Sequence, residues 1–275
     1  MASSPASPRA NSLATIIRPG GLSGRQTAAA AALLGVVIVL SWIFSIQQAR
    51  GMEDMAGTMG LGFVPFLVMW GPMVVAMMFP TMVPTAVAAV EEPGSARGPD
   101  HLPMAVRIGT FLVGYLLVWM AFGALIYGLL AGLGGLVDLS QRQARWLAAG
   151  VYAIAGLYQL TWPKDACRDR CRSCRCSYPS DGAGSRFFET VRVSVTHGVT
   201  CIGCCWGYMV VLIAVGMTNL VAMALLTVVI FVERHAPSRP VLVSRVAGVV
   251  LLAVAVATPF VSWLHPGLAD SGMHM

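Results

Sequence analysis

Residues 191–232, VRVSVTHGVTCIGCCWGYMVVLIAVGMTNLVAMALLTVVIFV, decide how this chain folds. The run is apolar almost throughout, and it is too long for one membrane crossing, which takes about 20 residues. Gly216, Thr218 and Asn219 interrupt it past its midpoint. We therefore predict two spanning helices that meet near Thr218 and Asn219. Asn219 is either a cap at the helix break or a functional polar group at membrane depth.

Similar apolar runs recur along the rest of the chain. Of its 275 residues, 57% are hydrophobic and 11% are charged, whereas a soluble domain has about 25% charged residues. This composition excludes a cytosolic enzyme, a disordered chain and a disulfide-framed secreted module. It predicts an all-α, polytopic transmembrane helical bundle of about seven spans in contact with the lipid bilayer. The further spans are predicted at residues 27–46, 61–90, 104–131, 143–160 and 241–264.

The positions of the cations orient this bundle. The formal net charge is +6, and the arginines cluster in short segments between the apolar runs, which argues against nucleic-acid binding along a basic face. With the N-terminus in the cytoplasm, all but three of the 18 formal cations fall on the cytoplasmic side. Arg50, Arg142 and Arg145 are the three that fall outside. The C-terminus then lies outside, and the predicted location is the plasma (inner) membrane.

The same pattern divides the chain into three parts. Residues 1–26 are rich in Ser, Pro, Ala and Gly and predict a disordered basic cytoplasmic tail. Residues 27–264 form the transmembrane helical domain, which contains a Cys-rich cytoplasmic loop at residues 163–190. Residues 265–275 form a short outer tail.

Six of the seven cysteines fall into two stripes at helical spacing, and Cys176 lies just beyond the first stripe. A short helix opening at Pro163 would place the first stripe on one face, because positions three and four apart are neighbours on a helix. The second stripe includes a histidine and lies near the cytoplasmic end of its span. Thiolates with one imidazole favour copper(I), with zinc(II) as the alternative. The candidate metal ligands are Cys167, Cys171 and Cys174 in the first stripe and His197, Cys201, Cys204 and Cys205 in the second.

Methionines form a second group of soft ligands. Met52, Met55 and Met59 lie in the predicted outer loop and are candidates for outer metal capture, since thioethers bind copper(I) without deprotonation. Inside the span at 61–90, further methionines recur near helical spacing. That pattern favours core packing, with a thioether path through the bundle as the alternative. These residues are Met69, Met73, Met77, Met78 and Met82.

Two polar residues precede the first cysteine stripe. Tyr158 and Gln159 are candidates to hydrogen-bond a ligand side chain, although they could equally belong to an interfacial belt with Trp162. The chain contains no Walker motif, Gly-rich dinucleotide loop or Ser-His-Asp pattern.

Three blocks carry a resemblance to a known family: WGPMVVAMMFPTMVP at 70–84, GLYQLTWPKDACRDRCRSC at 156–174 and HGVTCIGCCWGYMVVLIAVGMTN at 197–219. They resemble the predicted metal-binding integral membrane proteins, a family with a domain of unknown function whose members are sometimes labelled copper chaperones. The resemblance implies an inner-membrane protein with a metal site. Cys174 departs from the family pattern, which has a proline there, and Cys176 is an additional cysteine. The implied site residues are Cys167, Cys171, His197, Cys201, Cys204 and Cys205.

We therefore expect a membrane protein that binds, transfers or transports copper(I) and is not an enzyme. A metal-donor or metal-acceptor protein would be its partner, and ligand exchange between sulfur atoms would move the metal. One alternative is a membrane thiol-disulfide oxidoreductase that exchanges electrons with a quinone or a partner dithiol. Another is a structural zinc site that supports a partner-binding membrane protein.

Overall fold

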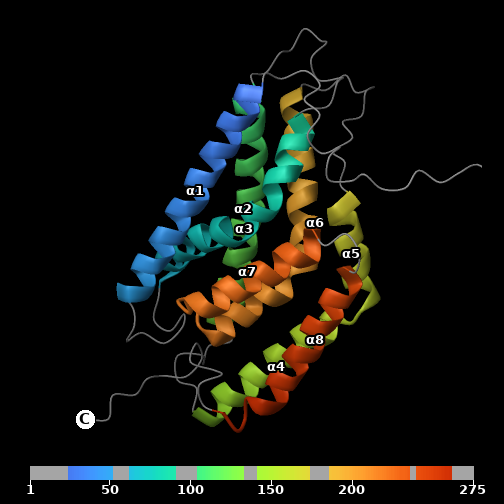
Figure 1. The fold of residues 1–275 in the computed structure, drawn as a ribbon. Helices are drawn as coiled ribbons and strands as arrows, with labels where there is room; N and C mark the ends of the chain where they lie inside the picture. Colours follow the sequence, from blue (N-terminus) through green and yellow to red (C-terminus); the bar gives the residue numbers. More distant parts are fainter. Residues whose placement is uncertain are drawn as a thin grey trace, which may run out of the picture.

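The structure, a computed structural model, describes residues 24–51, 62–90, 104–132, 141–173, 186–235 and 240–261. Within these ranges the chain forms eight helices and no strand (Figure 1). The all-α class is therefore confirmed. The helices are α1 (Gly24–Gly51), α2 (Phe63–Val90), α3 (Met104–Gly132), α4 (Gln141–Gln159), α5 (Trp162–Ser173), α6 (Arg186–Val215), α7 (Leu220–His235) and α8 (Pro240–Ala257).

The long apolar run breaks where the sequence predicts. α6 ends at Val215, and Gly216 takes a φ of 108°, a left-handed conformation that glycine adopts without steric cost. The side chain of Asn219 accepts a hydrogen bond of 3.0 Å from the backbone N–H of Ala222. Asn219 therefore caps the first turn of α7, as one of the two interpretations of this residue predicts.

Each of the other predicted spans contains a helix, with boundaries that shift by a few residues. α8 differs most, because it ends at Ala257, whereas the span was predicted to run to residue 264. Pro259 explains this end, since the residue before a proline is driven out of the helical conformation. Residues 262–264 and both predicted tails, apart from residues 24–26 at the start of α1, lie outside the described residues.

Four of the described helices are long and apolar enough to cross a membrane. They contain the segments Ala31–Gly51, Phe63–Met82, Val106–Gly132 and Phe187–Val215. α4, α7 and α8 have 19, 16 and 18 residues, and none of them is among these four. The count of seven spans and the orientation of the termini stay predictions.

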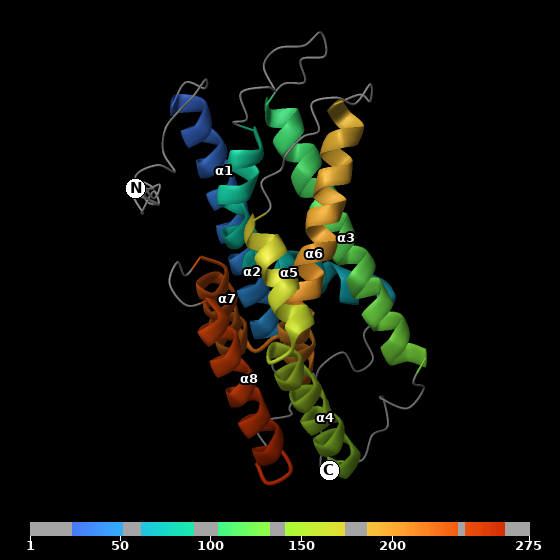
Figure 2. The ribbon, with the colours of Figure 1, turned by 90° about the vertical axis from the view of Figure 1, so that its right-hand side faces the viewer.

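α2 and α6 form the centre of the bundle, and more than half of the spanning segment of each is buried. α1 packs on α2, while α3 lies against both α2 and α6. α4 and α8 run side by side, and α5 lies along α6 (Figure 2). The outward faces carry exposed aliphatic side chains, as lipid contact requires.

α4 and α8 approach each other at a pair of glycines. A Cβ added to Gly156 would lie 2.9 Å from the carbonyl oxygen of Gly248. A Cβ added to Gly248 would likewise lie 2.9 Å from the carbonyl oxygen of Gly156. Small residues of this kind let two helix backbones come into close contact. The crossing fixes α4, and with it the turn that leads into α5.

We predict that Gly156→Leu lowers the free energy of unfolding by about 1–3 kcal/mol, because the new side chain must push α8 away. Thermal unfolding of the purified protein in detergent measures this effect. Gly150→Leu is the matched control on the same helix, since a Cβ there has no neighbour within 4 Å. Equal destabilisation by both substitutions would contradict the close α4–α8 crossing.

Candidate metal centre

Three buried thiols meet between α5 and α6. α5 has Pro163 in its first turn, as predicted, and carries Cys171, while α6 carries Cys201 and Cys204 one turn apart. The three Sγ atoms all lie within 4.8 Å of one another. Metal–sulfur bonds of about 2.3 Å place the sulfurs around one ion about 4 Å apart. The cluster therefore has nearly the dimensions of a three-sulfur metal site.

Two other predicted ligands of α6 lie beside this cluster. The Sγ of Cys205 is 3.3 Å from the Sγ of Cys204. His197 is fully buried one turn before Cys201, and its Nε2 lies 3.1 Å from the Sδ of Met82. α6 thus presents its four predicted ligands along one buried stripe.

Cys167 takes a different position from Cys171. It lies one turn earlier on α5 and faces α6 at Gly203, where an added Cβ would be 3.0 Å from its Sγ. It is not among the three clustered thiols. Cys174 and Cys176 lie outside the described residues, as do the outer candidates Met52, Met55 and Met59.

The thiols lie at mid-helix, not near the end of the span as the sequence suggested. Cys201 is the sixteenth of the 30 residues of α6, because the helix already begins at Arg186. A small cavity opens next to them between α5, α6 and α7. It is lined by Arg168, Cys171, Cys204, Cys205, Ile230, Glu233 and Arg234.

Hydrogen bonding with the thiols of Cys201 and Cys204, together with burial, raises the pKa of Cys171 well above its usual value. Cys171 is therefore protonated at neutral pH when no metal is bound. Binding of a metal ion to its sulfur would release that proton.

Arg234 brings a positive charge from α7 to the stripe on α6. Its guanidinium donates to the Nε2 of His197 at 2.7 Å and to the Sγ of Cys201 at 3.6 Å. A guanidinium can only donate, so Nε2 accepts and the ring proton of His197 lies on Nδ1. The hydroxyl of Tyr115 on α3 lies 3.1 Å from the same sulfur of Cys201. These contacts favour a thiolate at Cys201.

A buried ion pair holds the helices around the thiols. The Nζ of Lys164 on α5 lies 2.8 Å from the Oε1 of Glu233 on α7, and Lys164 also donates to the backbone carbonyl of Cys204. Tyr208 and Ser244 donate to Glu233 at 2.8 and 2.9 Å. The network therefore links α5, α6, α7 and α8.

The charge state of this pair follows from its surroundings. Burial has the largest single effect and lowers the pKa of Lys164, but the carboxylate of Glu233 and the thiols of Cys204 and Cys205 together outweigh it, and the pKa is raised overall. Lys164 therefore stays protonated at neutral pH.

The network and the contacts of Arg234 were missed from the sequence. In the sequence, Lys164 and Arg234 count only among the cations that set the topology, and Glu233 has no predicted role. One signal was available: Glu233 and Arg234 directly follow an apolar run, and Lys164 is the single lysine of the chain. Nothing in the sequence pointed to Tyr115.

Tyr158 supports the backbone of α6, whereas the buried amide of Gln159 makes no hydrogen bond within the described residues. The hydroxyl of Tyr158 donates to the carbonyl of Gly203, and its ring packs on Trp206 with centroids 5.0 Å apart. Gln159 is fully buried near Gly207. Trp162, in contrast, is 79% exposed. Tyr158 thus fixes the turn of α6 between Cys201 and Cys204.

The comparisons with known proteins agree with these observations. A family model described as "PpoB2: Copper chaperone" matches residues 67–258, more than two thirds of the chain. The match includes all the helices that carry the thiols and the ion pair. The resemblance inferred from the three sequence blocks is confirmed. No curated protein and no solved structure matches the chain.

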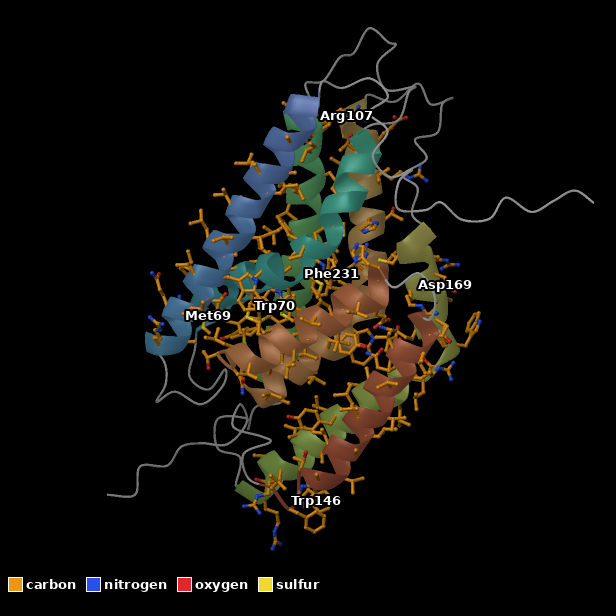
Figure 3. The ribbon with its side chains drawn as sticks, in the orientation of Figure 1. Met69, Trp70, Arg107, Trp146, Asp169 and Phe231 are labelled. Carbon is orange, nitrogen blue, oxygen red and sulfur yellow. The ribbon has the colours of Figure 1, made fainter. Side chains whose placement is uncertain are left out.

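We predict that Glu233→Gln destabilises the protein by about 3–5 kcal/mol, because it leaves the buried ammonium of Lys164 without its counter-charge. The double variant Lys164→Met/Glu233→Gln should recover much of this loss. Thermal unfolding in detergent measures both. Asp169→Asn is the control, and Asp169 is labelled in Figure 3. Its side chain is 68% exposed, and Arg168 keeps its ion pair with Asp165 at 2.8 Å, so this substitution should cost only about 0–1 kcal/mol. Equal losses in the single and double variants would contradict the pairing.

Proposed function

We propose that this protein holds copper(I) within a membrane and passes it to a partner protein. The premise is that the chain belongs to the PpoB2 copper-chaperone family. The observation that carries this proposal is the cluster of Cys171, Cys201 and Cys204, whose sulfurs lie within 4.8 Å of one another. Copper(I) is a soft cation that prefers thiolate and thioether ligands. Burial of all three residues keeps water and oxidants away from the bound ion.

The charges around the cluster suit copper(I) held by two thiolates. Copper(I) with two thiolates carries a net charge of −1, and a buried net charge is costly unless a counter-charge lies nearby. Arg234, at 3.6 Å from the sulfur of Cys201, supplies one positive charge. The charge of Lys164 is already matched by Glu233 at 2.8 Å. A copper(I) ion with two ionised thiols therefore leaves the centre close to neutral.

Release of the ion would proceed by ligand exchange. A ligand from the acceptor protein forms a bond to copper while one of the cysteine sulfurs leaves it and takes up a proton. Cys205, with its sulfur 3.3 Å from that of Cys204, can keep the ion coordinated during this exchange. No nucleotide-binding motif is present to drive the transfer, so the relative affinities of donor and acceptor set its direction.

We expect the variant Cys201→Ser/Cys204→Ser to lose one equivalent of tightly bound copper(I), because only one clustered thiol remains. Titration of the purified, reduced protein against a copper(I)-selective chelator measures this loss. Thr200→Val, next to Cys201 on the same helix, is the matched control and should bind as the parent protein does. Unchanged copper stoichiometry in the double cysteine variant would overturn the proposal. Tightly held zinc in its place, with no effect on copper transfer, would favour the structural zinc site.

A thiol-disulfide oxidoreductase is the second candidate, because the sulfurs of Cys204 and Cys205 lie 3.3 Å apart. Such an enzyme would join two thiols in a disulfide. The two electrons and two protons would pass to a quinone, or would reduce the disulfide of a partner protein.

The two functions predict different behaviour on oxidation. Metal-loaded protein exposed to a water-soluble quinone should keep its intact mass if copper binding is the function, since the metal protects the thiols. An oxidoreductase would instead lose the mass of two hydrogens in the metal-free state and regain it with a dithiol. Mass spectrometry of the intact protein distinguishes these results, and Cys204→Ser identifies the cysteine involved.

A further inference from the structure

A second group of sulfur atoms lies at the end of the bundle where α1 ends and α2 begins. A small pocket there lies between α1, the first turns of α2 and the turn that joins α6 to α7. Figure 3 shows Met69 at this end, close to the last turns of α1. One aromatic residue, three thioether residues and three polar ones line the pocket: Phe44, Met69, Met73, Met217, Ser45, Gln48 and Thr218.

The composition of this pocket differs from that of an apolar packing defect. Methionine often fills gaps in a core, but a gap of that kind does not need a hydroxyl or an amide at its wall. Met73 and Met217 are 3% and 6% exposed, while Met69 is half-buried. Three neutral thioethers from two separate parts of the fold form a donor set that suits copper(I).

Buried methionines continue from this pocket along α2. Met73, Met77, Met78 and Met82 follow one another at intervals of about one turn or less, and each is at most 3% exposed. From Met69 to Met82 the helix rises about 20 Å at 1.5 Å per residue. The Sδ of Met82 lies 3.1 Å from the Nε2 of His197, which is one turn before Cys201. Buried methionines therefore occur along α2 from the pocket to the level of His197.

We propose that Met69, Met73 and Met217 form an entry site for copper(I), and that the buried methionines of α2 connect this site, past His197, to the thiols. This inference rests on the proposed function of the thiols as a copper(I) site. Each step along the path exchanges one copper–sulfur bond for another and needs no electron. At the last step a thiolate replaces a thioether, and the thiol proton goes to water.

The order of affinities gives the path its direction. A thioether is neutral and binds copper(I) more weakly than an anionic thiolate does. An ion captured at the methionines therefore moves to the cysteines with a gain in free energy.

The test uses the purified full-length protein with copper(I) buffered by a selective chelator. The parent protein should bind a tight equivalent at the thiols and a weaker one at the methionines. Met69→Leu/Met73→Leu should lose the weaker equivalent alone, since leucine keeps the volume but has no sulfur. Met120→Leu on α3, which does not line the pocket, is the matched control. Unchanged stoichiometry in the double methionine variant would overturn the entry site.

A second measurement separates this inference from the proposed function. Cys201→Ser/Cys204→Ser should keep the weaker equivalent, so copper at the methionines without copper at the thiols would reject the proposed function alone. Met77→Leu/Met78→Leu should keep both equivalents but load the thiols with copper(I) several-fold more slowly. The rate at which the cysteines become protected from a maleimide reagent measures this loading. An unchanged loading rate in this variant would overturn the path along α2.

Discussion

The ion pair between Lys164 and Glu233 is the interaction on which the thiol cluster depends. Both side chains are removed from water, which is costly unless every charge and lone pair finds a partner. Here Tyr208 and Ser244 complete the shell of Glu233, and Lys164 also bonds to the carbonyl of Cys204. That last bond connects the pair directly to the turn of α6 that carries the thiols. The position of Cys171 on α5 relative to α6 is set by this connection.

The last turns of α7 contact both of the helices that carry the thiols. Glu233 and Arg234 are consecutive, and successive residues on a helix point about 100° apart. Glu233 therefore reaches Lys164 on α5, while Arg234 reaches His197 and Cys201 on α6. A shift of α7 along its axis would disturb the ion pair and the thiol environment together. The geometry of the site is thus tied to the packing of a helix that contributes no sulfur to the cluster.

Local sequence chemistry predicted much of this arrangement, and tertiary packing determined the rest. Run length and the residues 216–219 were enough to predict the break between α6 and α7. Helical spacing correctly placed Cys201 and Cys204 on one face. Spacing could not show that Cys167 faces Gly203, because that depends on how α5 lies along α6. Nor could it reveal Arg234 and Tyr115, which reach Cys201 across 33 and 86 residues of chain.

The electrostatics of the proposed path follow from the same low-dielectric interior. A copper(I) ion among neutral thioethers carries its full charge, so only close contact with polarisable sulfur offsets its loss of hydration. At the thiols the ion meets Arg234, which repels it. One ionised thiol would neutralise the copper alone and leave the charge of Arg234 unbalanced. Two ionised thiols balance the charges of both copper(I) and Arg234. The copper(I) ion is therefore held where a second thiol can release its proton. Arg234 thus makes the site at Cys201 favourable only for an ion that gathers more than one cysteine.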